Sequence, residues 1–275
     1  MPMLKNLETV RRVLDRQRRK DFLKDFHISD PVGFPKRFRR REDVETSSFI
    51  ASVFAIGPRY AIFRTLEKVF DLIGTSPHLA IINLDIAWLK KEMQGYIQFA
   101  YKNITGNDIA QILFVLKKIL NDYGSIESAA RSSMEAGEET AFGLLTALLE
   151  QMKAYRIPAS LGGSLTPRAA ALLASPRQGS ACKRMNMFLR WMTRKDEIDF
   201  GIYKWFRTDE LVVPLDVNVS RAARQLNLTS RKTDNWKTAV EITHTLKELD
   251  PVDPVKYDVP LFLYGIKLRK GLVAS

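Results

Sequence analysis

The spacing of the apolar residues constrains the fold most, because they recur every three or four positions along much of the chain. Phe49, Ile50 and Val53 begin one such stripe, and residues 60–73 carry another. Residues at this spacing share one face of an α-helix, whereas a half-buried strand needs apolar residues at alternate positions. The best strand candidate, Leu211-Val-Val, is very short. The sequence therefore predicts an all-α protein.

Glycine and proline divide the helical pattern into separate segments, because both residues disfavour the interior of a helix. A basic amphipathic helix is predicted from Leu4 to Phe26 and ends before Asp30-Pro31, since the residue before proline is pushed out of the α region. Further helices are predicted at about residues 42–56, 60–73, 86–99, 107–123, 138–155 and 167–174.

The chain is long enough for two helical lobes that share a cleft. Leu161-Gly-Gly-Ser164 is the predicted hinge between them. The predicted organisation is a basic N-terminal helix and loop (1–41) packing on the core, a first lobe (42–160) and a second lobe (161–275). The second lobe would contain a hairpin at 175–183, the region around Asp216 and C-terminal helices.

Cysteine and histidine are too scarce for several kinds of site. The single cysteine, Cys182, excludes an internal disulfide and a cysteine-rich metal or iron–sulfur site, and the three histidines are isolated in sequence. We expect no metal, no metal cluster and no cofactor. The apolar runs are too short to span a membrane, and the first residues lack the apolar core of a secretory signal. We expect a cytoplasmic monomer without a membrane partner.

The net charge of +12 is unevenly placed. Residues 1–41 carry 13 Lys/Arg against 5 Asp/Glu, and residues 183–237 carry 12 against 7. Two basic regions suit a nucleic acid, because cations that neutralise phosphates release condensed counterions. Basic excess that only keeps the protein soluble is the alternative. The cluster at 36–41 has the same two interpretations: Arg39 and Arg40 contact phosphates, or the cluster is a solvated charge run.

Residues 175–180 predict a tight turn between two helices. The N-terminus of the second helix would direct backbone N–H groups outward, where a nucleic-acid phosphate can bind. An ordinary helix–helix turn has the same composition. In the first interpretation, the residues in contact with DNA are Arg177, Gln178, Gly179, Ser180 and Arg184.

Lys183 and Asp216 are the candidate catalytic residues. Lys183 falls in the first turn of a helix, where the helix dipole favours the neutral, nucleophilic amine. A lysine that points into solvent or at a phosphate is the alternative. Asp216 precedes a helical stripe, so its default role is helix N-cap, which is compatible with a catalytic role.

Other polar and aromatic side chains near these two residues also have two interpretations. Trp191, Trp205 and Phe206 would stack on a base or belong to the core. Further polar contacts with DNA are expected from Asn186, Arg190, Asn218, Arg221 and Arg224.

The segment Val213-Pro-Leu-Asp-Val-Asn-Val-Ser-Arg-Ala-Ala-Arg-Gln-Leu-Asn-Leu228 resembles Val-Asp-Thr-His-Val-x-Arg-x-x-x-Arg-Leu-Gly-Leu of the helix-hairpin-helix DNA glycosylase superfamily, whose aspartate is catalytic. Residues 175–187 resemble the hairpin of that superfamily, whose bifunctional members carry a nucleophilic lysine after it. The whole chain is similar to a little-characterised bacterial family allied to these enzymes. Its pattern is nearest to that of the archaeal 8-oxoguanine glycosylases.

The resemblance implies a two-lobed glycosylase fold with a helix-hairpin-helix element, and base-excision repair of double-stranded DNA in the cytoplasm, at the nucleoid. A damaged base, for example an oxidised purine, would be flipped out, and Lys183 would form a Schiff base with the sugar while Asp216 accepts its proton. Departures from the motif, including Asn218 and a turn without Pro-Gly-x-Gly, favour an alternative: a non-catalytic protein that binds lesions or DNA structure. A helical module that binds a protein partner is a third hypothesis.

Overall fold

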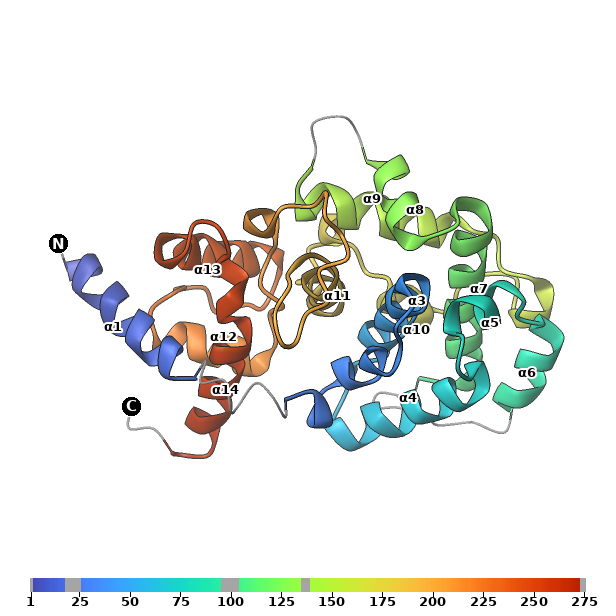
Figure 1. Ribbon diagram of the computed structural model, residues 1–275, viewed down its shortest axis with the longest axis horizontal. Helices are drawn as coiled ribbons and strands as arrows, with labels where there is room; N and C mark the ends of the chain where they lie inside the picture. Colours follow the sequence, from blue (N-terminus) through green and yellow to red (C-terminus); the bar gives the residue numbers. More distant parts are fainter. Residues whose placement is uncertain (1, 18–25, 95–103, 135–138, 273–275) are drawn as a thin grey trace. The chain divides into compact units, whose positions relative to one another are not determined.

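The computed structural model describes residues 2–17, 26–94, 104–134 and 139–272, and Figure 1 traces their helices. Within these ranges the regular elements are α-helices and short 3₁₀-helices, without a strand. One isolated bridge joins Lys195 and Phe200. The prediction of an all-α protein is confirmed. No helix in these ranges is long and apolar enough to cross a membrane.

The chain divides into two compact units, and one of them is made of two segments that are separate in the sequence. Unit 1 comprises Met1–Phe26 and Pro176–Ser275, and unit 2 comprises His27–Ser175. The division therefore falls after residues 26 and 175, whereas the sequence places boundaries after 41 and 160. The N-terminal helix belongs with the C-terminal half of the chain because it packs on the last helix, α14 (Asp258–Arg269).

Unit 2 is built around two buried helices. α3 is buried from Asp43 to Val53, and α7 packs against α5, α6, α8, α9 and α10, of which Figure 1 shows α5 and α6 beside it. A capping box between Thr105 and Asp108 begins α7, and Gly124 ends it in the left-handed conformation. The helices are α3 (Arg41–Val53), α4 (Arg59–Ile73), α5 (Pro77–Ile82), α6 (Ile86–Gln94), α7 (Gly106–Tyr123), α8 (Ile126–Ser133), α9 (Ala141–Ala154) and α10 (Pro167–Leu172).

The predicted hinge is a turn that lies inside unit 2. Gly162 and Gly163 have φ angles of 106° and 77°, which glycine adopts without strain. The buried side chain of Gln111 donates from Nε2 to the carbonyls of Leu161 (2.7 Å) and Ser164 (2.9 Å). Its Oε1 accepts from the backbone N–H of Thr166 (2.8 Å). These bonds fasten the turn to α7.

We expect Gln111→Leu to lower the free energy of unfolding by about 1–2 kcal/mol, because the Ser164 carbonyl and the Thr166 N–H would lose their partner and the buried Leu161 carbonyl would keep only the longer bond from Asn107 Nδ2 (3.3 Å). Urea unfolding followed by circular dichroism measures this loss. Gln225→Leu is the control, since Gln225 is exposed at the end of α12 (Val217–Gln225). Equal stability of the two variants would contradict the role of Gln111.

Unit 1 contains α1 (Pro2–Gln17), α11 (Lys183–Thr193), α12 (Val217–Gln225), α13 (Trp236–Leu249) and α14. α1 buries Val10 and Leu14, and Gln17 accepts a hydrogen bond from Lys267 Nζ of α14 (2.6 Å). The predicted N-terminal helix is thus present over Pro2–Gln17, and its predicted continuation through residues 18–25 lies outside the described residues.

Candidate functional site

Lys183 is the first residue of α11, as the sequence predicts. The chain reaches it through a 3₁₀-turn (Pro176–Gln178), Gly179 with φ +75°, and Cys182 with φ +47° as the N-cap. The N–H of Trp236 donates to the Gly179 carbonyl (3.3 Å), which attaches the turn to the start of α13. Lys183 is half-buried, and its side-chain amine forms no hydrogen bond or ion pair with another described residue. Its amine is therefore available to a ligand.

Asp216 caps the N-terminus of α12, which confirms its default role. Its Oδ1 accepts from the backbone N–H groups of Asn218 and Val219, both at 2.8 Å. Oδ2 takes part in no hydrogen bond within the described chain, and the residue is half-buried. One oxygen therefore fixes the carboxylate to the helix, while the other can accept a proton.

A chain of charges links α11 to the surroundings of Asp216 inside unit 1. Arg190 lies two helical turns after Lys183 on α11, and its Nη1 forms an ion pair with Asp258 Oδ2 in the first turn of α14. Burial raises the pKa of Asp258 to about 6; attraction to Arg190 opposes this rise, and repulsion from Asp216 adds to it. Asp216 therefore interacts electrostatically with the carboxylate that Arg190 holds.

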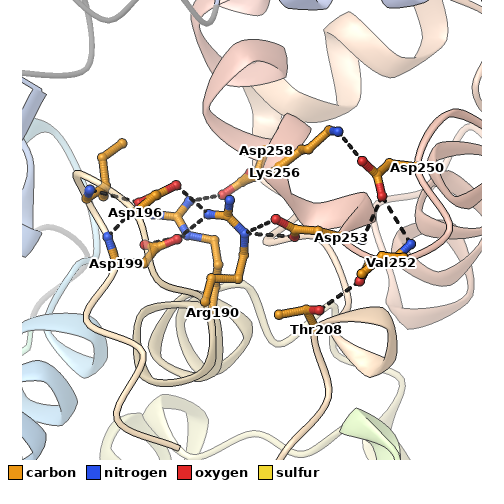
Figure 2. Close-up of polar contacts among 11 residues, drawn as sticks. Arg190, Asp196, Asp199, Thr208, Asp250, Val252, Asp253, Lys256 and Asp258 are labelled. Atoms are coloured by element: carbon orange, nitrogen blue, oxygen red, sulfur yellow. Dashed lines mark hydrogen bonds and ion pairs between the residues drawn. The ribbon is translucent and has the colours of Figure 1, made fainter. Parts of the chain in front are cut away.

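Figure 2 shows that Arg190 and Asp258 belong to a larger set of charges, which we call the buried ion network. Arg190 Nε lies 3.2 Å from Asp199 Oδ1, and Arg194 Nη1 pairs with Asp199 Oδ2. Arg194 Nε lies 2.8 Å from Asp253 Oδ1, and its Nη1 lies 3.0 Å from Asp196 Oδ2. The network thus consists of Arg190, Arg194, Asp196, Asp199, Asp253 and Asp258.

This network was not predicted from the sequence, in which Arg190 was expected to make a polar contact with DNA. Arg190 and Arg194 are buried and their guanidinium groups are engaged by aspartates, so Arg190 holds the core of unit 1 together. Arg190 lies within the apolar run Met187–Met192, and Arg194 follows four positions later at the C-cap of α11. This pattern would have signalled buried partners, because an isolated charge is rarely buried.

The raised pKa of Asp258 should make the stability of the fold depend on pH. Its raised pKa means that the folded state binds the proton more tightly than the unfolded state, so this carboxyl stabilises the fold at low pH and loses that contribution as the pH rises through about 6. We therefore expect the free energy of unfolding of Asp258→Asn, relative to that of the wild type, to rise by about 2 kcal/mol as the pH increases from about 4.5 to about 7. Urea unfolding at several pH values measures this difference. Asp71→Asn, at an exposed position, is the control, and a constant difference for Asp258→Asn would refute the prediction.

The predicted phosphate contacts of the turn differ in exposure. Arg177, Gln178 and Gly179 are exposed. Ser180 is half-buried, and its hydroxyl accepts from the N–H of Cys182, the N-cap of α11 (3.1 Å). Arg184 is half-buried, and burial lowers its pKa to about 10. The outer residues of the turn are therefore the ones most accessible to a phosphate.

The predicted contacts on α12 are used for packing inside unit 1. Arg221 Nη1 donates to Asn218 Oδ1 (3.1 Å) and to the Gly265 carbonyl of α14 (3.4 Å). Arg224 Nη2 donates to Asp234 Oδ1 (2.5 Å). Both guanidinium groups therefore hold α12 in position.

The predicted DNA contacts Arg39 and Arg40 do not belong to the same unit as the candidate catalytic residues. Both arginines are exposed and lie in unit 2, whereas Lys183 and Asp216 lie in unit 1. Arg40 also donates to Glu42 Oε1 (3.3 Å). Of the aromatic candidates, Trp191 and Phe206 are buried in the core, and Trp205 is half-buried beside Phe206, with ring centroids 5.4 Å apart.

The fold defines an all-α protein of two compact units, and unit 1 contains both candidate catalytic residues. Residues 30–267 match the family described as "Protein of unknown function (DUF2400)", and the chain belongs to this family. No curated protein and no solved structure matches the chain. The family description names no activity, so the motif residues and their geometry carry any argument about function.

Proposed function

We propose that the protein is a bifunctional DNA glycosylase that removes a damaged base and cleaves the strand through a lysine Schiff base. The supporting observation is that Lys183 and Asp216 occupy the N-terminal ends of two helices in unit 1, with the Lys183 amine and Asp216 Oδ2 unbonded within the described chain. The resemblance of residues 213–228 to the catalytic segment of the helix-hairpin-helix glycosylases supports the same assignment.

The chemistry divides between these two side chains. The Lys183 amine attacks C1′ of the flipped nucleotide, the C1′–N bond breaks, and the base leaves with the bonding electrons and is protonated. Asp216 accepts the proton that Lys183 loses and stabilises the positive charge at the sugar. Opening of the sugar ring gives the imine, and loss of a C2′ proton then expels the 3′-phosphate.

Borohydride trapping on duplexes that carry 8-oxoguanine or an abasic site tests this proposal. We expect the wild type to form a covalent adduct and Lys183→Gln to form none, because glutamine has no nucleophilic amine. Lys195→Gln is the control, since Lys195 is exposed just after α11. An adduct that persists in Lys183→Gln would refute the assignment of the nucleophile. Binding without adduct or base release by the wild type would leave a non-catalytic lesion-binding protein.

Asp216→Asn separates the structural from the chemical role of Asp216. Asparagine caps helices as well as aspartate, so stability should stay within about 0.5 kcal/mol of the wild type. Asparagine cannot accept the proton, so we expect the adduct to form about 10²- to 10⁴-fold more slowly. Single-turnover trapping and urea unfolding measure the two quantities. A variant that unfolds, or one that traps at the wild-type rate, would contradict this division of roles.

A further inference from the structure

Unit 2 carries a surface whose parts come from two separate segments of the chain. The Phe34 ring packs on Phe63 of α4, with centroids 5.4 Å apart, and on Phe70 at 5.1 Å. The Phe38 ring also stacks on Phe70, at 6.0 Å. These ring contacts anchor residues 34–38 along α4, so the basic loop that follows and the exposed side of α4 belong to one surface.

Arginines and one tyrosine gather around the Phe34–Phe63 contact. The Arg37 guanidinium lies 4.3 Å from the centroid of the Phe34 ring. Arg59 and Tyr60 precede Phe63 by four and three positions, so they are its neighbours on the surface of α4. Arg64 follows Tyr60 by four positions, one turn further along the helix. We call Arg37, Arg39, Arg59, Tyr60 and Arg64 the basic face of unit 2.

The side chains of the basic face are available to a partner. All five residues are exposed, and 76% of Tyr60 is accessible. The guanidinium groups of Arg39, Arg59 and Arg64 form no hydrogen bond or ion pair with any residue that the structure describes. The acids of α4, Glu67 and Asp71, lie further along the helix, so its first turns are basic.

We propose that the basic face binds a single-stranded segment of nucleic acid, with phosphates on its arginines and an unpaired base stacked on Tyr60. Arginines bind phosphates through paired N–H donors, and the counterions they release favour binding. An exposed aromatic ring among them adds a stacking platform that only an unpaired base can use. All residues of this surface lie in unit 2, whereas Lys183 and Asp216 of the proposed glycosylase reaction lie in unit 1.

The test is fluorescence anisotropy of the full chain with a short labelled oligothymidylate, an oligouridylate and a hairpin duplex, over a range of salt concentrations. We expect both single strands to bind more tightly than the duplex. Tyr60→Ala should weaken single-strand binding about 5- to 100-fold, while Tyr60→Phe retains it. The logarithm of the binding constant falls linearly with the logarithm of the salt concentration, and Arg59→Gln and Arg64→Gln should each make this slope shallower by about 0.7.

Two controls remove an aromatic ring and an arginine elsewhere in unit 2. Trp88→Ala removes another exposed aromatic ring, on α6, and Arg156→Gln removes an exposed arginine after α9. We expect both to bind the oligothymidylate as the wild type does. Because every variant keeps Lys183 and Asp216, the result is independent of whether the borohydride adduct forms.

Three outcomes would overturn the proposal. One is wild-type affinity in Tyr60→Ala. Another is an unchanged salt slope in both arginine variants. The third is Tyr60-dependent binding to phosphatidylglycerol vesicles without binding to either oligonucleotide, which would identify an anionic lipid surface as the partner of the basic face.

Discussion

Replacing Arg190 with methionine is expected to lower the free energy of unfolding by about 3–5 kcal/mol. Methionine keeps most of the volume of the arginine stem but removes the cation that pairs with Asp258 and Asp199. Asp199 retains Arg194, whereas Asp258 has no other ion pair among the described residues. A buried carboxylate without a partner either stays charged at high cost or takes up a proton.

Unfolding by urea, followed through tryptophan fluorescence, measures this loss, because Trp191 is buried in unit 1 close to Arg190 in sequence. The matched control is Arg207→Met, which removes an arginine paired with Asp209 at an exposed position and should cost at most about 1 kcal/mol. The loss in Arg190→Met should be smaller at about pH 5 than at about pH 7, since protonation of Asp258 removes the unpaired charge. Equal losses at both pH values would show that the cost comes from packing alone.

The helices could be predicted because their signals are local. Residues 60–73 form α4 (Arg59–Ile73) and residues 107–123 form α7 (Gly106–Tyr123), as expected. In both, glycine or proline lies next to the apolar stripe and fixes where the helix ends. The predicted helices did not include α5, which begins at Pro77, because proline is favoured in the first turn of a helix.

The pairing between distant segments could not be predicted, because no local pattern encodes it. Arg190 and Asp258 are 68 positions apart and meet only after α11 and α14 have packed. The same is true of Gln111, whose partners begin 50 positions later in the chain. The turn at residues 161–164 was interpreted as a hinge from its glycines alone, although a buried side chain of α7 fixes it.

The roles predicted for Asp216 come from a local sequence pattern and from the resemblance to the glycosylases. Its position before a helical stripe predicts the cap, and the resemblance predicts the chemistry. The structure adds that the cap uses one carboxylate oxygen for two backbone N–H groups. It also places Asp216 where its charge raises the pKa of Asp258, a member of the buried ion network.

Gly265→Ala is also expected to lower the free energy of unfolding, because α14 contacts the backbone of α12 at this position. A Cβ atom added at Gly265 would lie 2.0 Å from the carbonyl oxygen of Asn218 and 2.6 Å from its carbonyl carbon. Neither atom belongs to a flexible side chain, so one of the two helices must move. We expect a loss of about 2–3 kcal/mol, which is partly offset by the better helix propensity of alanine.

The movement should also reach the proposed chemistry, since Asn218 N–H is one of the two donors that hold Asp216 Oδ1. We therefore expect Gly265→Ala to form the borohydride adduct more slowly while its affinity for the abasic duplex is retained. Gly74→Ala is the control: it strains a backbone with φ +65°, but it lies in unit 2 and its Cβ would meet no neighbour. Gly74→Ala should lose stability and keep the wild-type rate of trapping. If both variants slow trapping equally, general destabilisation and not the position of α12 controls the rate.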